Sequence, residues 1–126
     1  MKTENVVIYC RTSDLSKGES PTDSLNHQKN EGLKWFNGTN KGYHLFKIYE
    51  DRISGDSSII ERGEGRELIS DIEDGNVNVI WVHKLDRLQR NISKSFQFRE
   101  LCEENGVLLV ENGSVYDFTT DKSLIE

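Results

Sequence analysis

The chain has 126 residues, 34% of them hydrophobic, which suits one domain with a modest hydrophobic core. Its apolar runs are far shorter than the roughly 20 residues of a membrane span, and its N-terminus lacks a secretory signal pattern, so a cytoplasmic location is expected. The formal net charge of −6 argues against a protein that coats nucleic acid without specificity.

The first expected elements are a strand, a loop and a helix. Residues 5–10 are β-branched and apolar, which predicts a buried strand. Residues 11–22 are rich in Ser, Asp and Gly and predict a loop. Asp23 or Ser24 then caps a helix that is expected to stop at Gly38.

The middle of the chain repeats this alternation. Residues 44–49 alternate between apolar and polar side chains, as a second strand would, and a polar loop is expected over residues 51–62. A second helix is predicted over residues 65–74, with Gly75 at its end.

The last expected elements begin with a strand over residues 77–83, which is apolar without alternation. That pattern indicates burial on both faces, as in a parallel sheet covered by helices. A helix over residues 92–105 and a strand over residues 107–110 follow. The polar segment 111–126 receives no assignment.

Strands that alternate with helices predict an α/β fold with a mainly parallel sheet of about four or five strands flanked by helices. In such sheets, sites form beyond the carboxyl ends of the strands. The polar residues that follow predicted strand ends are Arg11, Ser13, Asp51, Asp86, Arg87 and Arg90. The topology therefore predicts that these residues converge at one edge of the sheet.

A serine among several arginines points to chemistry on phosphate. Guanidinium groups match two phosphate oxygens at once and stabilise charge that builds on them. The three histidines have no plausible triad arrangement, and the G-x-S-x-G elbow of many hydrolases is absent. Cys10 and Cys102 lack metal-ligand spacing, so no metal or other cofactor is expected. A Walker loop, a cysteine phosphatase loop and the paired acids of a receiver domain are also absent. Ser13 with arginines therefore predicts attack on a phosphodiester.

Several short segments, in this order, resemble motifs of the serine site-specific recombinases, the resolvase and invertase family. They are YCRTS at residues 9–13 (Y-x-R-x-S), SLNHQ at residues 24–28, DRISG at residues 51–55 (D-x-x-S-G), Arg62 before the second helix, and KLDRLQRN at residues 84–91 (L-D-R-L-x-R). Each motif alone is weak, but the ordered set is specific, and it spans about residues 6–121.

The resemblance implies that Ser13 attacks a DNA phosphate, forms a 5′-phosphoserine link and releases a 3′-hydroxyl. The residues implied to bind the scissile phosphate are Arg11, Arg87 and Arg90. The implied supporting roles are those of Arg62 and Gln28 around the phosphate, Asp86 in holding or relaying a proton, Lys84 in contacting DNA, and Asp51 and Ser54 behind the site. The resemblance does not identify the base that activates Ser13. It implies DNA as partner, and self-association as a dimer or tetramer in the full-length protein.

Three departures from the family pattern bear on this interpretation. Gly63 follows Arg62 where the family often has proline. The acidic net charge suggests that most DNA affinity resides elsewhere. The sequence stops near residues 121–124, where the family's long dimerisation helix would start. We therefore expect residues 1–126 to be a single resolvase-like catalytic domain, and a fragment of a longer recombinase.

Two other functions remain compatible with the sequence. One is a non-catalytic resolvase-like domain that regulates or assembles a recombinase. The other is a hydrolase that uses Ser13 on small phosphate esters. The intact set of serine and arginines favours the recombinase. Whether the enzyme integrates, inverts or resolves DNA is left open.

Overall fold

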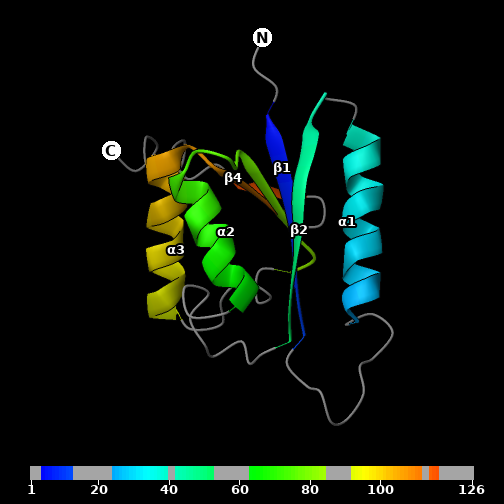
Figure 1. Ribbon diagram of the computed structural model, residues 1–126, viewed down its shortest axis with the longest axis horizontal. Helices are drawn as coiled ribbons and strands as arrows, with labels where there is room; N and C mark the ends of the chain where they lie inside the picture. Colours follow the sequence, from blue (N-terminus) through cyan, green and yellow to red (C-terminus); the bar gives the residue numbers. More distant parts are fainter. Residues whose placement is uncertain are drawn as a thin grey trace.

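The structure is a computed structural model, and it describes residues 4–12, 24–39, 42–52, 63–84, 92–111 and 114–116. Strands and helices alternate through most of the chain (Figure 1). In chain order the elements are β1 (Asn5–Thr12), α1 (Leu25–Thr39), β2 (His44–Arg52), α2 (Gly63–Glu73), β3 (Val79–Val82), α3 (Ile92–Asn105), β4 (Leu108–Glu111) and β5 (Ser114–Tyr116).

The strands form one sheet in the order β2-β1-β3-β4-β5. The pairs β1–β2, β1–β3 and β3–β4 are parallel, and β5 pairs antiparallel with β4. This architecture confirms the predicted α/β class with a mainly parallel sheet. The fifth strand comes from the polar segment that received no assignment, because three residues are too short for a visible hydrophobic period.

Helices cover both faces of the sheet, with α1 on one face and α2 and α3 on the other (Figure 1). Alternate side chains of β1 reach the two layers. Val6, Ile8 and Cys10 belong to the core cluster that includes Leu25 of α1. Their neighbours in β1 pack into the second cluster, with residues of α2 and α3. The unbroken apolar run in β1 therefore results from burial on both faces, in agreement with the buried strand predicted for residues 5–10.

A glycine allows α1 to lie very close to the sheet. A Cβ built on Gly32 would lie 2.9 Å from Ile8 Cγ2 and 2.9 Å from Trp81 Cε3. Real Cβ atoms essentially never come this close to another heavy atom. Gly32 is thus required by packing, because any side chain here would push α1 away from β1 and β3.

Several predicted boundaries are wrong by a few residues. Gly38 lies inside α1, which continues to Thr39. Asp51 belongs to β2 and not to a loop, because it pairs with Arg11 of β1. Helix α2 starts two residues earlier than predicted, and β3 is shorter than the apolar run around it. The predicted stop at Gly75 is confirmed, since its φ of +79° is a left-handed value that favours glycine.

The two cysteines lie on opposite sides of the sheet, and both thiols are free and buried. Burial raises the pKa of Cys10 and of Cys102 to about 12. Both thiols are therefore protonated at pH 8, and the thiolate is the form that reacts.

We expect both cysteines to react with iodoacetamide far more slowly than free cysteine at pH 8 in the native protein. Denaturation in urea should restore the ordinary rate, because it exposes the thiols and returns their pKa values to about 8.5. Mass spectrometry of quenched samples would follow each site. Rapid native labelling of Cys102, whose pKa is raised by burial alone, would contradict its placement.

Candidate functional site

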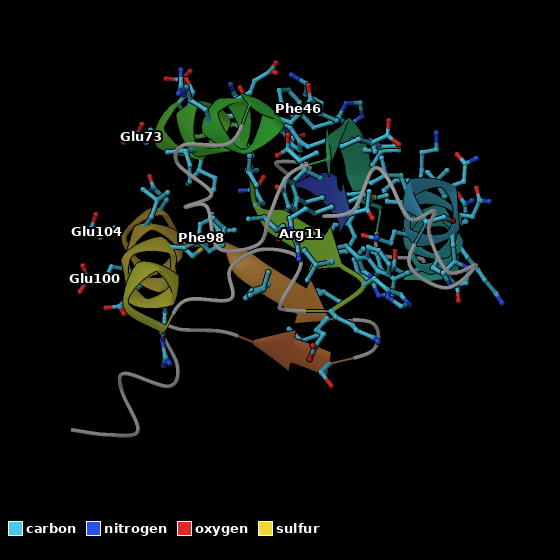
Figure 2. All side chains as sticks on the ribbon, turned by 90° about the horizontal axis from the view of Figure 1, so that it is seen from below. Arg11, Phe46, Glu73, Phe98, Glu100 and Glu104 are labelled. Atoms are coloured by element: carbon cyan, nitrogen blue, oxygen red, sulfur yellow. The ribbon has the colours of Figure 1, made fainter. Side chains whose placement is uncertain are left out.

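One edge of the sheet collects the elements that carry the predicted site. The carboxyl ends of β1 and β2 lie at this edge, and all three helices begin there (Figure 1). Figure 2 looks onto this edge, with Arg11 near its middle, between α1 on one side and α2 and α3 on the other. Helix N-termini carry partial positive charge, and side chains already cap two of them here: Ser24 accepts from the first turn of α1, and Asp51 accepts from the first turn of α2.

Arg11 is held through its backbone by the side chain of Gln28. Gln28 Nε2 donates to the Arg11 carbonyl oxygen at 3.0 Å, and Gln28 Oε1 accepts from the Arg11 N–H at 3.1 Å. Both residues are buried, with exposed fractions of 1% for Arg11 and 0% for Gln28. A buried amide that makes both bonds fixes the position of the strand at Arg11.

The length of β3 explains why a helix side chain makes this contact. The pairing of β1 with β3 ends where Tyr9 meets Val82. Beyond that point, the polar backbone groups of Arg11 need another partner on that side of β1. Gln28, in the first turns of α1, supplies one donor and one acceptor in place of a strand.

The side chain of Arg11 belongs to the face covered by α2 and α3. Alternation along β1 places it on the same side as Val7 and Tyr9, which pack into the core cluster beneath those helices. In the sequence, Arg62 directly precedes α2, and Arg90 lies two residues before α3. Arg62 and Arg90 therefore precede, in the sequence, the two helices that cover the face of the sheet on which Arg11 lies.

Asp51, the register partner of Arg11, receives three hydrogen bonds. Its Oδ1 accepts from the Glu64 N–H at 2.9 Å. Its Oδ2 accepts from the Gly65 N–H at 3.0 Å and from the Tyr9 hydroxyl at 2.7 Å. Asp51 is 6% exposed, so this carboxylate caps α2 from within the core.

Two histidines also lie at this edge, and the sequence patterns assigned neither of them to the site. The rings of His27 in α1 and His83 after β3 have an edge-to-face arrangement with centroids 5.4 Å apart. His83 is buried and also lies beside Trp81, with 6.4 Å between ring centroids. In the sequence, one lies at a helix start and the other just after a strand end, and these positions could have placed both at this edge of the sheet. Lys84 follows His83 and is exposed, as a DNA contact requires.

Of the predicted site residues, the structure places Arg11, Gln28, Asp51 and Lys84. It brings Arg11 together with Gln28 and Asp51 at adjacent strand and helix ends. The predicted residues that lie outside the described part of the chain are Ser13, Ser54, Arg62, Asp86, Arg87 and Arg90.

Among the residues that the structure describes, no three His, Cys, Asp or Glu side chains are grouped so as to hold a metal ion. In that part of the chain, no helix has the length and apolar character needed to cross a membrane.

Comparisons with known proteins agree on one family. The family model described as "Resolvase, N terminal domain" matches residues 6–125. No curated protein sequence matches the chain.

Three solved structures share its fold at 26–27% identity. The N-terminal catalytic domain of TP901-1 integrase has a TM-score of 0.74, with 86% of this chain and 78% of that chain covered. The C-terminal catalytic domain of ISC1926 TnpA, an IS607-like serine recombinase, has a TM-score of 0.69, with 87% and 69% covered. A resolvase family site-specific recombinase from Streptococcus pneumoniae has a TM-score of 0.67, with 98% and 81% covered.

Proposed function

Because the chain belongs to the family of resolvase N-terminal domains, we propose that it breaks and rejoins DNA strands as a serine recombinase catalytic domain, with Ser13 as nucleophile. The observation that carries this proposal is the fixed position of Arg11. The Gln28 amide holds its backbone, two residues before Ser13, at the edge where the helices begin. A guanidinium recognises a phosphodiester because it matches two of its oxygens at once.

The proposed reaction conserves the phosphodiester bond energy. Ser13 Oγ bonds to phosphorus and loses its proton, and the bond from phosphorus to the 3′ oxygen breaks. The 3′ oxygen takes up a proton and leaves as a hydroxyl, while the 5′ end stays linked to the serine. A 3′-hydroxyl then attacks the phosphoserine in the reverse sense, which seals the DNA and releases Ser13. No nucleotide cofactor is needed.

The remaining residues take the roles that the family resemblance implies. Arg11, Arg87 and Arg90 bind the scissile phosphate and stabilise the charge of the transition state. Arg62 and Gln28 support the site around the phosphate, and Asp86 holds or relays a proton. Lys84 contacts DNA, and Asp51 and Ser54 support the site from behind. We further propose that the protein acts in the cytoplasm as a dimer or tetramer.

The burial of Arg11 adds a condition to this proposal. With an exposed fraction of 1%, its side chain does not meet bulk solvent. Contact between the guanidinium and a DNA phosphate therefore requires a rearrangement that uncovers it. We expect this rearrangement when DNA binds, since a phosphate offers the guanidinium two oxygens as hydrogen-bond acceptors.

The test is to trap the covalent intermediate. The chain, fused to a sequence-specific DNA-binding domain, is mixed with DNA that carries paired sites for that domain. The reaction is quenched with denaturant and examined for protein attached to DNA 5′ ends, and mass spectrometry maps the attachment. We expect an adduct at Ser13 that is lost in Ser13→Ala. The control Ser70→Ala, at an exposed serine of α2, should retain it.

Two other results would redirect the assignment. A folded, DNA-bound and tetramer-competent fusion that gives no adduct would support the non-catalytic interaction domain. Turnover of a chromogenic phosphodiester that is lost in Ser13→Ala, with no DNA adduct, would support the small-ester hydrolase.

A further inference from the structure

The exposed positions of α1 carry no acidic side chain, although the chain as a whole has a net charge of −6. Successive residues of a helix are about 100° apart, so positions 26, 30, 34 and 37 share one side of α1. All four are exposed, and they are Asn26, Asn30, Lys34 and Asn37. We call this set of four residues the α1 stripe. It extends about 16 Å along the helix.

The donors of the α1 stripe are uncommitted within the described part of the chain. There, neither the three asparagine amides nor the Lys34 ammonium forms a side-chain hydrogen bond or an ion pair with another described residue. By contrast, Lys29 of the same helix pairs with Glu50 of β2 at 3.9 Å. Glu31, the one acidic residue of α1, is half-buried and lies outside the stripe. The stripe therefore presents amide and ammonium N–H groups to solvent, and such groups bind phosphate oxygens of DNA.

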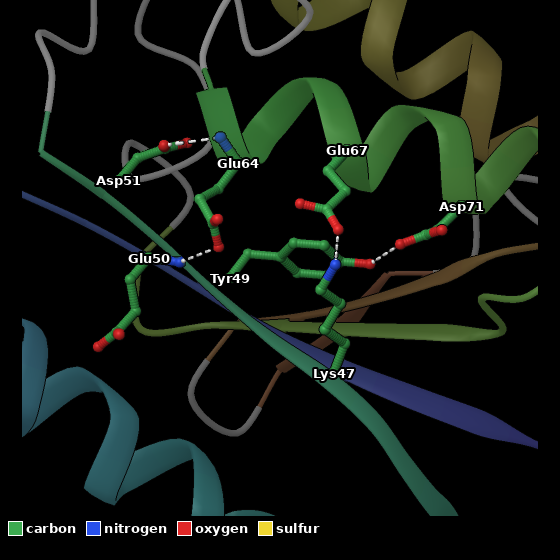
Figure 3. Close-up of polar contacts among 7 residues, drawn as sticks. All are labelled: Lys47, Tyr49, Glu50, Asp51, Glu64, Glu67 and Asp71. Carbon is green, nitrogen blue, oxygen red and sulfur yellow. Dashed lines mark hydrogen bonds and ion pairs between the residues drawn. The ribbon is translucent and has the colours of Figure 1, made fainter.

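The side of the domain covered by α2 and α3 has the opposite charge. The exposed acidic residues on the side away from α1 include Glu73, Glu100 and Glu104 (Figure 2). Where α2 faces β2, the one lysine of that strand, Lys47, is paired with Glu67 of α2 (Figure 3). The phosphate backbone of DNA is therefore repelled from the side of α2 and α3, and α1 offers it a surface without that repulsion.

The α1 stripe begins beside Lys84, the residue proposed to contact DNA. The rings of His27 in α1 and His83 after β3 lie with their centroids 5.4 Å apart. Asn26 precedes His27, and the exposed Lys84 follows His83. The ring contact therefore brings Lys84 near the first turn of α1. DNA that meets Lys84 at the edge of the sheet can continue along the stripe without crossing the acidic side of the domain.

We propose that the α1 stripe is a second contact surface for the phosphate backbone of duplex DNA, next to the edge that carries Arg11. This inference rests on the proposed function, which makes DNA the substrate. The stripe binds phosphates and reads no base sequence, so it orients the domain on DNA without choosing a site. It also explains how a chain with an acidic net charge approaches DNA, because the attraction comes from one side only.

The first experiment measures how the unfused chain binds a fluorescent duplex of arbitrary sequence, by anisotropy at several salt concentrations. Loss of one phosphate-bound cation lowers the slope of log affinity against log salt concentration by about 0.9. We expect this fall for Lys34→Ala. We do not expect it for the matched control Arg66→Ala, which removes an exposed cation of α2. Both variants change the net charge equally, so equal falls would show that total charge governs binding and would overturn the inference.

An asparagine of the stripe allows a charge to be introduced with little change of shape. Asn30→Asp places a carboxylate where we expect a phosphate, so binding at low salt should weaken several-fold and recover little when salt is lowered further. Ser70→Asp adds the same charge to an exposed position of α2 and should bind as wild type does. Thermal unfolding would confirm that both variants fold. An Asn30→Asp affinity equal to that of Ser70→Asp would contradict the proposed surface.

A local cleavage reagent reports whether DNA lies along α1 in the fusion. Both native thiols are buried, so an exposed cysteine introduced by Asn30→Cys reacts first with a thiol-directed iron chelate. We expect the tethered iron to cut the bound DNA close to the position of the Ser13 adduct. The same reagent attached through Ser70→Cys, on α2, should cut much less. Equal cutting from the two positions would argue against a path along α1.

The outcomes separate this inference from the proposed function. If the fusion forms the Ser13 adduct while Lys34→Ala and Arg66→Ala bind alike, the proposed function stands and the stripe has no role. If binding depends on Lys34 but the fusion forms no adduct, the stripe remains a DNA contact and the catalytic function is lost. An unfused wild-type chain that does not bind duplex DNA at low salt would overturn the inference.

Discussion

Replacing Gln28 with leucine is expected to lower the free energy of unfolding by about 2–6 kcal/mol. The substitution keeps the approximate size of the side chain but leaves the buried N–H and carbonyl of Arg11 without Gln28 as a partner, at about 1–3 kcal/mol for each buried group. Urea unfolding followed by circular dichroism would measure the change. The same variant should slow Ser13 adduct formation, because the backbone at Arg11 is no longer fixed.

Two further variants make this expectation specific. Asn26→Leu exchanges an exposed amide in the same helical turn and should change stability by less than about 0.5 kcal/mol. Gln28→Glu keeps the acceptor for the Arg11 N–H, but it brings a second oxygen against the Arg11 carbonyl unless the carboxyl is protonated. If Gln28→Leu had the same urea midpoint of unfolding as the wild type, the Gln28 amide would not stabilise the fold.

The Gln28→Glu variant should also depend on pH in a defined direction. Burial and the facing carbonyl raise the pKa of the introduced carboxyl above its unfolded value of about 4.3. The protonated form can donate, so the variant is nearest to wild type in stability at low pH. It loses stability as the pH rises through the raised pKa. The gap to wild type should therefore be larger at pH 8 than at pH 5.

A leucine at Gly32 is expected to destabilise the protein by about 3 kcal/mol, despite the better helix propensity of leucine. The side chain would enter space that Ile8 and Trp81 already fill, since even a Cβ would lie 2.9 Å from each of them. Gly32 is one turn from Gln28 on the buried side of α1. A displaced helix would therefore also pull the amide away from Arg11 and slow the adduct.

Gly38 of the same helix is the matched control for this substitution. A Cβ at Gly38 would meet nothing within 4 Å, so Gly38→Leu should be neutral or stabilise by up to about 1 kcal/mol. Thermal unfolding of the two variants side by side would separate crowding from helix propensity. Equal melting temperatures would show that α1 does not need a glycine to reach the sheet.

Sequence patterns predicted the order of elements because burial determines those patterns. The apolar runs of β1 and β3 are apolar on both faces, and each does lie between helix layers. Boundaries were less predictable where tertiary contacts decide them. Asp51 looks like a loop residue in sequence, yet pairing with β1 and the three donors around its carboxylate keep it in β2. The short β5 exists only because β4 offers it an edge.

Only part of the candidate site could be predicted from the sequence, because tertiary contacts also decide which residues meet there. Parallel strands bring their carboxyl ends together, which was enough to group Arg11 with Asp51. The motif at residues 24–28 drew attention to Gln28 only through family resemblance. Its two bonds to the Arg11 backbone depend on where β3 stops, which no local pattern encodes. The same holds for His27 and His83, which meet only after α1 packs beside the end of β3.

The interior position of β1, between β2 and β3, has a consequence for synthesis of the protein. The Asn5 N–H bonds the side chain of Asn78, 73 residues later, and the strand next to β1 on that side begins at Val79. At about 5–20 residues per second, a ribosome needs on the order of 4–15 s to make the intervening chain. During that time the apolar strand β1 has a backbone edge whose partner strand, β3, has not yet been made. The growing chain is thus most exposed to aggregation before Val82 emerges, and chaperones that hold extended apolar segments would act on it in this interval.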